Sequence, residues 1–280
     1  MSAPTSPATA PTPPWPLPTL VTASIGLHAV ALGAAVLVPG AWPWALGAVV
    51  LDHALITGTC LTPRSNWLGA NVTRLPQAAI ARREIALTID DGPDPDVTPQ
   101  VLDLLDAHGQ HATFFCIAER VAAHPALARE IVARGHSIQN HTARHCHDFS
   151  FLGPTGYAAE IGRAQDLLAS MTGERPSCFR APAGLRNPFL APVLHRMGLQ
   201  LVSWTRRGFD TRERDAAKVL ARLVRGLAAG DILLLHDGNA ARTAAGRPVI
   251  LDVLPPLLAR CAELKLRAVT LPHALAAGQE

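Results

Sequence analysis

The chain has 280 residues, which is enough for one sizeable domain with an appendage. Its formal charge of +3 is too small to indicate a nucleic-acid partner, which requires a concentrated basic face. The five cysteines are widely spaced without a CxxC pair, so they predict buried thiols rather than a disulfide framework or a structural zinc knot.

The first 63 residues differ from the rest, because Asp52 is their only acidic residue and they contain no Lys or Arg. Residues 1–16 are rich in proline and predict a disordered tail. Two apolar runs follow, over 17–38 and 41–61, and each is long enough as a helix to cross a hydrocarbon core of about 30 Å. We therefore expect a transmembrane helical hairpin over 17–63, with a pair of buried core helices as the alternative.

Ionisable side chains interrupt this apolar region. Folding the chain about Gly40 brings His28 beside Asp52 at nearly the same depth. Such groups are costly inside a bilayer, so we expect an inward-facing polar pair or a contact in a homo-oligomer, with a direct functional role as the alternative.

Basic residues indicate the orientation of the hairpin. None precedes the first apolar run, which argues against a cleavable signal peptide. The first is Arg64, and Arg74, Arg82 and Arg83 follow it. The positive-inside rule therefore predicts an inner-membrane protein whose large domain lies on the cytoplasmic side.

The pattern changes at Glu84, after an expected linker over 64–83. Short apolar runs then alternate with segments of helical periodicity, and these runs are IALTID, ATFFCI, SIQNH, SCFRAP, QLVSWT, DILLLHD and LRAVTL. Helices are expected between them, for example over 98–109, 120–134 and 158–171. The alternation predicts an α/β domain over 84–280, with a parallel sheet that is either open or closed into a barrel.

Polar side chains stand at the carboxyl ends of several expected strands, where parallel α/β folds gather their reactive residues. They are Asp90, Asp91, His141, Arg180, His236 and Asp237.

Two of these strand ends suggest a metal site. His141 and His145 are four residues apart, so their imidazoles point the same way on a helical turn. One carboxylate from Asp90 or Asp91 completes a two-histidine, one-carboxylate metal site, which would activate water and polarise a carbonyl. The other aspartate as base and His236 as acid complete the groups needed to hydrolyse an amide or ester.

The segments LTIDDGPDP, HTARH, FRAPAG and LLLHD, in this order and spacing, resemble the motifs of the polysaccharide deacetylases, carbohydrate esterase family 4 with the NodB-homology domain. The resemblance covers about residues 84–272 and implies a distorted (β/α) barrel with seven repeats. It also implies removal of an N-acetyl or other N-acyl group from an amino sugar in a polysaccharide, oligosaccharide or lipid-linked glycan. The implied cofactor is a divalent metal, Zn²⁺ or alternatively Co²⁺, Ni²⁺ or Mn²⁺.

The resemblance also implies roles for the motif residues. Asp90 would be the general base, held ionised by Arg180. The metal ligands would be Asp91, His141 and His145. His236 would be the general acid that protonates the leaving amine, and Leu234 would line the pocket for the acyl methyl group.

Two positions depart from the family's usual pattern. Where the family commonly has an aromatic residue in RPPYG, this chain has Ala183, whose backbone N–H would still bind the developing oxyanion without offering a surface for sugar stacking. The usual Asp-Trp pair that tunes the acid histidine is not present as such. Asp210 is the candidate for orienting His236, and Trp204 in the same segment is expected to contact substrate.

Other residues near the motifs keep two interpretations. His147 is either an additional site contact or a surface histidine, and Cys146 as a metal ligand is a minority alternative. The arginines around Asp210 would suit a phosphate or another acidic group on the substrate, or belong to a solvated loop. They are Arg206, Arg207, Arg212 and Arg214.

The sequence therefore predicts a membrane-anchored, metal-dependent amidohydrolase that acts on an N-acylated amino sugar. The alternatives are a deformylase or an O-esterase on the same scaffold, or a non-catalytic membrane sugar-binding protein. A cytoplasmic domain would meet a lipid-linked or nucleotide-linked sugar, whereas a domain on the outer side would meet peptidoglycan or an exported polysaccharide.

Overall fold

The computed structural model describes residues 14–276, so most of the expected tail over 1–16 lies outside the described residues. Eight strands form one sheet in the order β5-β4-β3-β2-β1-β7-β6, with β8 paired to the start of β1, and all pairs are parallel. The strands are β1 (Glu84–Asp90), β2 (Ala112–Cys116), β3 (Ser137–Asn140), β4 (Cys178–Phe179), β5 (Gln200–Leu201), β6 (Arg206–Arg207), β7 (Ile232–His236) and β8 (Arg267–Ala268).

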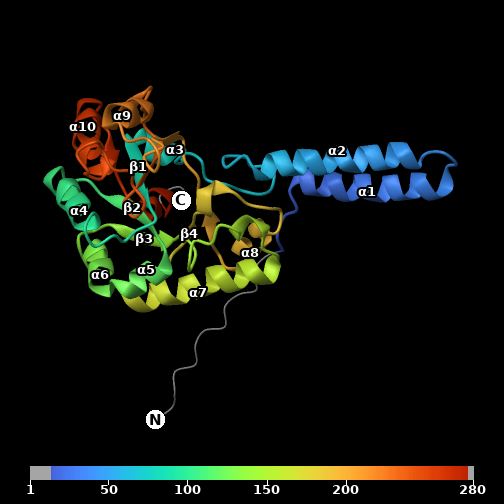
Figure 1. Cartoon of the computed structure of the whole chain (residues 1–280), viewed down its shortest axis with the longest axis horizontal. Coiled ribbons are helices and arrows are strands. Elements are labelled where there is room, and N and C mark those ends of the chain that lie inside the picture. The colour runs from blue at the N-terminus through green and yellow to red at the C-terminus, as the bar shows by residue number, and fades with distance from the viewer. Residues whose placement is uncertain (1–13, 277–280) are drawn as a thin grey trace, which may run out of the picture.

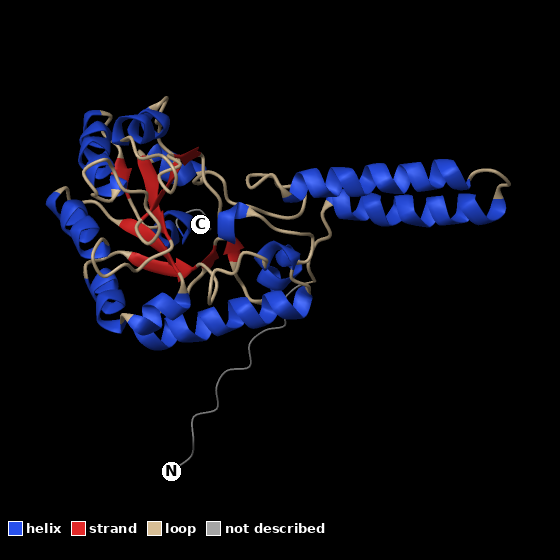
Figure 2. Ribbon diagram, viewed as in Figure 1, coloured by secondary structure: helices blue, strands red, loops and turns tan. Residues whose placement is uncertain are grey.

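The sheet curls into a half-barrel with helices around its outer side (Figure 2). Within the described residues its edge strands β5 and β6 do not pair with each other, so the barrel stays open there. The central strands β1, β2 and β7 are buried along their whole length, as expected for apolar runs covered on both faces. The predicted parallel α/β architecture is thus confirmed, in the form of an incomplete barrel.

The helices of this domain alternate with the strands. They are α3 (Gln77–Ala81), α4 (Thr98–Ala107), α5 (Ala118–Ala123), α6 (Pro125–Ala133), α7 (Pro154–Thr172), α8 (Leu190–Arg196), α9 (Ala216–Val224), α10 (Val249–Glu263) and α11 (Leu271–Ala276), with 3₁₀ turns at η1 (Phe149–Phe151) and η2 (Pro182–Gly184).

Some elements differ from the sequence-based expectation. The helix expected over 120–134 is divided at His124 into α5 and α6, because Pro125 has no N–H to continue the first helix. Strand β6 was not expected, since its two arginines carry no apolar signal, and it forms by pairing with Leu233 and Leu234 of β7.

The first two helices, α1 (Thr19–Leu37) and α2 (Trp42–Cys60), pack against each other as an antiparallel hairpin that projects from the domain (Figure 1). Large apolar side chains are exposed along it, including Val30, Leu51 and Trp44. Of the described helices, α1 alone is both long and apolar enough to cross a bilayer.

Polar side chains meet midway along the hairpin. The hydroxyl of Ser24 donates to Asp52 Oδ2 at 2.6 Å, and His28 Nδ1 lies 3.9 Å from the same oxygen. Nε2 of His28 is 3.2 Å from Nε2 of His53. His28 and Asp52 are therefore side by side, and the Asp52 carboxylate makes its contacts with Ser24 and His28 inside the hairpin.

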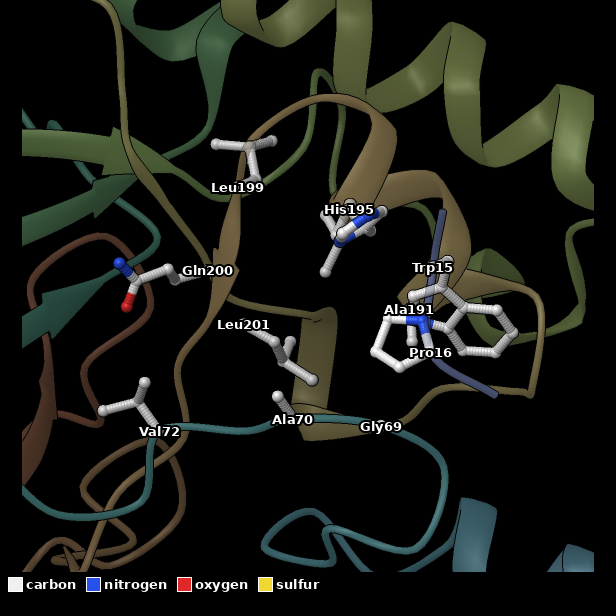
Figure 3. A pocket seen from close by; sticks show the side chains of 11 residues that line it. Trp15, Pro16, Gly69, Ala70, Val72, Ala191, His195, Leu199, Gln200 and Leu201 are labelled. Atoms are coloured by element: carbon white, nitrogen blue, oxygen red, sulfur yellow. The ribbon is translucent and has the colours of Figure 1, made fainter. Parts of the chain in front are cut away.

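Both ends of the hairpin contact the domain. Before α1, Trp15 and Pro16 lie beside Ala191 of α8 and line a cavity of about 330 Å³ (Figure 3). After α2, the segment 64–83 packs on the domain through buried apolar side chains, and Val72 bridges to Val202 beyond β5. The segment expected to be a linker thus covers one edge of the sheet.

Candidate metal and catalytic site

Neighbouring parallel strands bring the central residues of the site to one edge of the sheet. Asp90 ends β1 and lies in register with His236, the last residue of β7. His141 follows β3, and Arg180 follows β4. Since parallel strands end at the same edge, these side chains meet there, as the sequence pattern predicts.

Asp91, His141 and His145 form a compact group of potential metal ligands. Nε2 of His141 is 3.2 Å from Oδ1 of Asp91, and Nε2 of His145 is 3.4 Å from the same oxygen. One ligand atom from each residue lies within 4.8 Å of the others. The structure thus brings together the three residues that the sequence analysis expects to hold the metal.

The hydrogen bonds around this group fit a bound cation. Nδ1 of His141 lies 2.8 Å from the carbonyl oxygen of Arg180, which can only accept, so Nδ1 carries the proton. In a neutral ring Nε2 then presents a lone pair to Asp91, whose Oδ1 is buried without a hydrogen-bond partner among residues 14–276. A divalent metal would satisfy both the ring nitrogen and the carboxylate oxygen.

Charges in the site set the protonation of these ligands. Burial alone would raise the pKa of Asp91, but His141, His236 and His145 hold this pKa well below its usual range. Burial lowers the pKa of His145, and the nearby His141 lowers it further. Burial also lowers the pKa of His141, yet Asp90 and Asp91 raise it above its ordinary value, so a metal would displace a proton from this ring.

The segment that carries the two histidines is not the helical turn expected from their spacing. Residues 141–148 form a loop, in which Thr142 and His145 have φ values of 70° and 57°. The Thr142 hydroxyl accepts a hydrogen bond from the N–H of His145 at 2.8 Å, which fixes this loop. The two imidazole rings converge to 4.9 Å between centroids. The spacing therefore identified a converging pair, whereas the local structure assumed for it was wrong.

Asp90 is held by the buried Arg180. Nη1 of Arg180 donates to Asp90 Oδ1 at 2.7 Å and to the hydroxyl of Thr88 at 2.7 Å, and Nη2 donates to the carbonyl oxygen of Ser203 at 3.0 Å. Burial lowers the pKa of Arg180, while the Asp90 carboxylate opposes that shift. Oδ2 of Asp90 lies 3.9 Å from Nε2 of His141, so one oxygen is fixed by the guanidinium and the other lies nearer to the metal ligands.

His236 is paired with Asp210, the residue that the sequence analysis selects for this contact. Asp210 Oδ1 is 2.9 Å from Nδ1 of His236, and Asp210 Oδ2 accepts from the backbone N–H of His236 at 2.7 Å. Burial lowers the pKa of His236, but the charge and hydrogen bond of Asp210 raise it above its ordinary value. The pair therefore favours a protonated imidazole that can donate through Nε2.

The potential metal ligands, Asp90 and His236 line one pocket of about 280 Å³, with Arg180 and Asp210 buried behind them. The three residues expected to contact substrate, Ala183, Trp204 and Leu234, all line it, and Ala183 takes a left-handed conformation with φ of 54°. His147 also lines the pocket. The pocket is also lined by Asp90, Asp91, His141, His145, Arg207, Arg212, His236 and Asn239.

The structure separates several residues that the sequence grouped with the site. Arg206 turns away and pairs with Asp231 at 2.5 Å, whereas Arg207 and Arg212 line the pocket. Asp237 is buried beside Thr98, whose hydroxyl donates to it at 2.5 Å, and it does not line the pocket. Burial raises the pKa of Asp237 to about 7.

Two positioning residues were not found from the sequence. Asn239 Nδ2 donates to Asp91 Oδ2 at 2.8 Å and so orients a potential metal ligand. Thr88 accepts from Arg180 and donates to the carbonyl oxygen of Leu233 at 2.6 Å. A threonine inside an apolar strand and an asparagine in a Gly-Asn pair are ordinary in a strand and a turn, so neither carries a distinguishing sequence signal.

The sheet is a curled parallel half-barrel, and at one edge it carries two histidines and a carboxylate close enough to hold one metal ion, beside a fixed aspartate and a buried histidine. This is the arrangement expected of a hydrolase with a metal site. Comparison with known proteins identifies the family. A model described as polysaccharide deacetylase matches residues 78–202.

Two relatives and one solved structure illustrate the match. A peptidoglycan-N-acetylglucosamine deacetylase of Bacillus cereus is 36% identical over 166 residues, which are 57% of this chain and 75% of that protein. A chitooligosaccharide deacetylase of Bradyrhizobium sp. (strain ANU 289) is 36% identical over 157 residues, 56% of this chain and 71% of that protein. A crystal structure of a peptidoglycan N-acetylglucosamine deacetylase has a TM-score of 0.66 at 25% identity and covers 74% of this chain and 92% of its own. This chain belongs to the polysaccharide deacetylase family.

The ligand group leads to a direct prediction for metal binding. We expect Asp91→Asn and His141→Ala to weaken Zn²⁺ binding at least about 100-fold, because each removes one ligand from a set of three. Binding is measured by competition with a zinc indicator on the full chain in detergent. His147→Ala, which alters a nearby pocket histidine, and His28→Ala, which alters the hairpin, are the controls. Equal weakening in all four variants would contradict this metal site.

Proposed function

We propose that this protein is a metal-dependent deacetylase that hydrolyses the N-acetyl group of an amino sugar in a glycan. The observation that carries this proposal is the convergence of three groups in one pocket: the metal ligands around Asp91, the fixed carboxylate of Asp90, and His236 paired with Asp210. The similarity to a peptidoglycan-N-acetylglucosamine deacetylase and a chitooligosaccharide deacetylase supports the substrate class.

In this proposal Asp91, His141 and His145 hold the metal. Two imidazoles and one carboxylate suit Zn²⁺, which accepts such a set and leaves positions open. When bound, the metal would lower the pKa of a water molecule and polarise the acyl carbonyl. Asn239 orients Asp91, and the carbonyl oxygen of Arg180 orients His141.

The remaining residues move protons and position the substrate. Asp90 accepts a proton from the water whose oxygen bonds to the acyl carbon, and Arg180 keeps that carboxylate ionised and oriented. Protonated His236 then gives its Nε2 proton to the amine nitrogen as the carbon–nitrogen bond breaks. The products are acetate and a free amino sugar. The backbone N–H of Ala183 would stabilise the negative oxygen that develops on the acyl group, and Leu234 would contact its methyl group.

We further propose that α1 and α2 are a membrane hairpin, that residues 64–83 join it to the catalytic domain over 84–280, and that this domain lies on the cytoplasmic side of the inner membrane. The apolar exterior of the hairpin and the hydropathy of α1 support the anchor. The packing of α1 on α2 and the contacts of Trp15 with the domain favour a retained anchor over a removable signal sequence. A homo-oligomer through His28 and Asp52 is part of the same proposal.

Removal of Asp90 as a base tests the reaction. We expect Asp90→Asn to lower kcat/KM at least about 100-fold while metal binding is retained, because an amide cannot accept the proton from water. Acetate and formate release from N-acylated chitooligosaccharides and from O-acetylated sugars is measured on the metal-loaded full chain. Asp96→Asn, which changes an exposed carboxylate of the same loop, is the matched control. Release of formate but not acetate would favour a deformylase, and release only from O-acetyl sugars would favour an esterase.

The His236–Asp210 pair predicts the alkaline limb of the pH profile. Because Asp210 raises the pKa of His236, activity should fall as the pH rises through that raised value. Asp210→Asn removes the charge, so the pKa of His236 drops and the alkaline limb of kcat/KM should move to lower pH. A uniform loss of activity with an unchanged pH profile would instead mean that Asp210 has only a structural role.

Reporter fusions test the membrane orientation. With the catalytic domain in the cytoplasm, a C-terminal green fluorescent protein should fluoresce and a C-terminal alkaline phosphatase should be inactive. The phosphatase needs oxidised cysteines, which form outside the cytoplasm. The reverse pattern would place the domain outside and make peptidoglycan the expected substrate.

A further inference from the structure

Two arginines in the catalytic pocket have no acidic partner. Arg207 and Arg212 line the pocket, and within residues 14–276 neither forms an ion pair. Of the other arginines of this region, Arg206 pairs with Asp231 at 2.5 Å and Arg222 with Glu213 at 3.1 Å, whereas Arg214 is exposed and does not line the pocket. Among the arginines of this region, Arg207 and Arg212 are therefore the two that bring an unpaired positive charge to the pocket.

Arg207 is held in place by its strand and by aromatic rings. It lies in register with Leu234 on the neighbouring strand, and side chains in register on adjacent strands share a face, so both reach the pocket. Its guanidinium carbon lies 5.2 Å from the centre of the Trp204 ring and 5.1 Å from that of Phe209. Its Nε is buried and lacks a hydrogen-bond partner in the described part of the chain, so a ligand oxygen would satisfy it.

The catalytic groups do not neutralise the positive charges of Arg207 and Arg212, because each catalytic charge already has its own partner. Asp90 is paired with Arg180, and Asp210 is paired with His236. Asp91 faces the two histidines of the proposed metal site. With a divalent metal balancing Asp91, the described residues leave the guanidinium groups of Arg207 and Arg212 as unpaired positive charges in the pocket, and such a pocket attracts an anion.

We propose that Arg207 and Arg212 form a subsite for a phosphate group carried by the N-acylated sugar. The inference rests on the proposed deacetylase function and names its substrate class, a sugar phosphate. In a 2-acylamino sugar the acylated nitrogen is attached to C2, the carbon next to C1, so a phosphate on C1 and the scissile amide are close enough to occupy one compact pocket together. Guanidinium groups match phosphate oxygens with paired N–H donors, which a neutral glycan does not require.

The surroundings of the pocket connect this subsite to the hairpin. Trp204 lines the catalytic pocket and also a second cavity of about 540 Å³, whose wall includes Thr62, Arg64 and Trp67 at the end of α2. A sugar phosphate on a lipid carrier would approach from this side, whereas a free sugar phosphate would enter from solvent. Both sources present the same phosphate chemistry to Arg207 and Arg212.

Binding tests the subsite independently of turnover. The full chain with Asp90→Asn, loaded with Zn²⁺ in detergent, is titrated calorimetrically with N-acetylglucosamine 1-phosphate and with methyl N-acetylglucosaminide. We expect the phosphate to bind at least tenfold more tightly, and Arg207→Gln or Arg212→Gln to abolish that preference. Arg214→Gln removes an exposed arginine of the same segment that does not line the pocket, and should preserve the preference. Equal binding of the two ligands, or equal loss in all three variants, would overturn the subsite.

Turnover by the unmodified chain separates the two proposals. Acetate release is measured from chitooligosaccharides, from N-acetylglucosamine 1-phosphate, and from polyprenyl-diphosphate-linked N-acetylglucosamine in liposomes. Preference for either phosphate substrate supports the subsite, and the better of the two identifies its source. Equal turnover of the neutral glycan would overturn the subsite and leave the deacetylase function intact. Selective phosphate binding without acetate release from any substrate would overturn the deacetylase function and retain the subsite.

Discussion

The site depends on Arg180, whose side chain positions Asp90 and whose backbone carbonyl positions His141. The buried guanidinium donates to Asp90, and the carbonyl oxygen of the same residue fixes the tautomer of His141. The guanidinium also contacts the hydroxyl of Thr88 and lies 4.1 Å from the centre of the Phe115 ring, so β1, β2 and β4 meet around it. Removing one partner of a buried ion pair costs about 3–5 kcal/mol, because the other charge is left uncompensated. The relative positions of Asp90, the proposed base, and His141, a proposed metal ligand, therefore follow from one residue.

Around this rigid centre, the loops take backbone conformations that side chains disfavour. Asp91, Thr142, His145 and Ala183 all have positive φ, between 54° and 75°. Each such residue costs on the order of 1 kcal/mol, and strain of this kind persists only where the surrounding structure enforces it. Here the buried strands and the Thr142–His145 hydrogen bond provide that support. These conformations allow Asp91 and His145 to reach the same point as His141.

The sequence predicts the parts of the site that follow from strand ends. Asp90, His141, Arg180 and His236 each end or follow an apolar run, and parallel pairing is enough to bring them together. Asp210 was selected because the resemblance implies an aspartate beside the acid histidine, although the usual Asp-Trp pair is not present as such, and the structure places Asp210 beside His236.

Other features could not be read from the sequence because they depend on tertiary contacts. Whether Arg206 or Arg207 faces the pocket is decided by the pairing of a two-residue strand with no apolar signal. The role of Asn239 depends on the approach of its loop to Asp91 across the sheet edge, which no local pattern encodes. The loop at His141 illustrates the same limit, since a spacing of four residues is compatible with both a helical turn and a strained loop.

The hairpin and the pocket are coupled by short-range contacts. The carbonyl oxygen of Pro63 accepts a hydrogen bond from the Ser203 hydroxyl at 2.7 Å, and Arg186 donates to the carbonyl oxygen of Ser65. Gly184 has a φ of 74°, and a Cβ there would lie 2.6 Å from Pro63 and 2.7 Å from Trp204, so only glycine allows the chain leaving α2 to lie against the pocket wall.

These contacts fix the position of the pocket relative to the hairpin, which a flexible linker would not do. If α1 and α2 lie in the bilayer as proposed, the distance between the metal ligands and the membrane surface is set by these contacts. A substrate confined to the same membrane would then meet the pocket at a high effective concentration, provided that its reactive group reaches that height. A soluble glycan would gain nothing from this geometry. The attachment of the hairpin to the pocket wall therefore bears on the choice of substrate, which the proposed metal site alone does not determine.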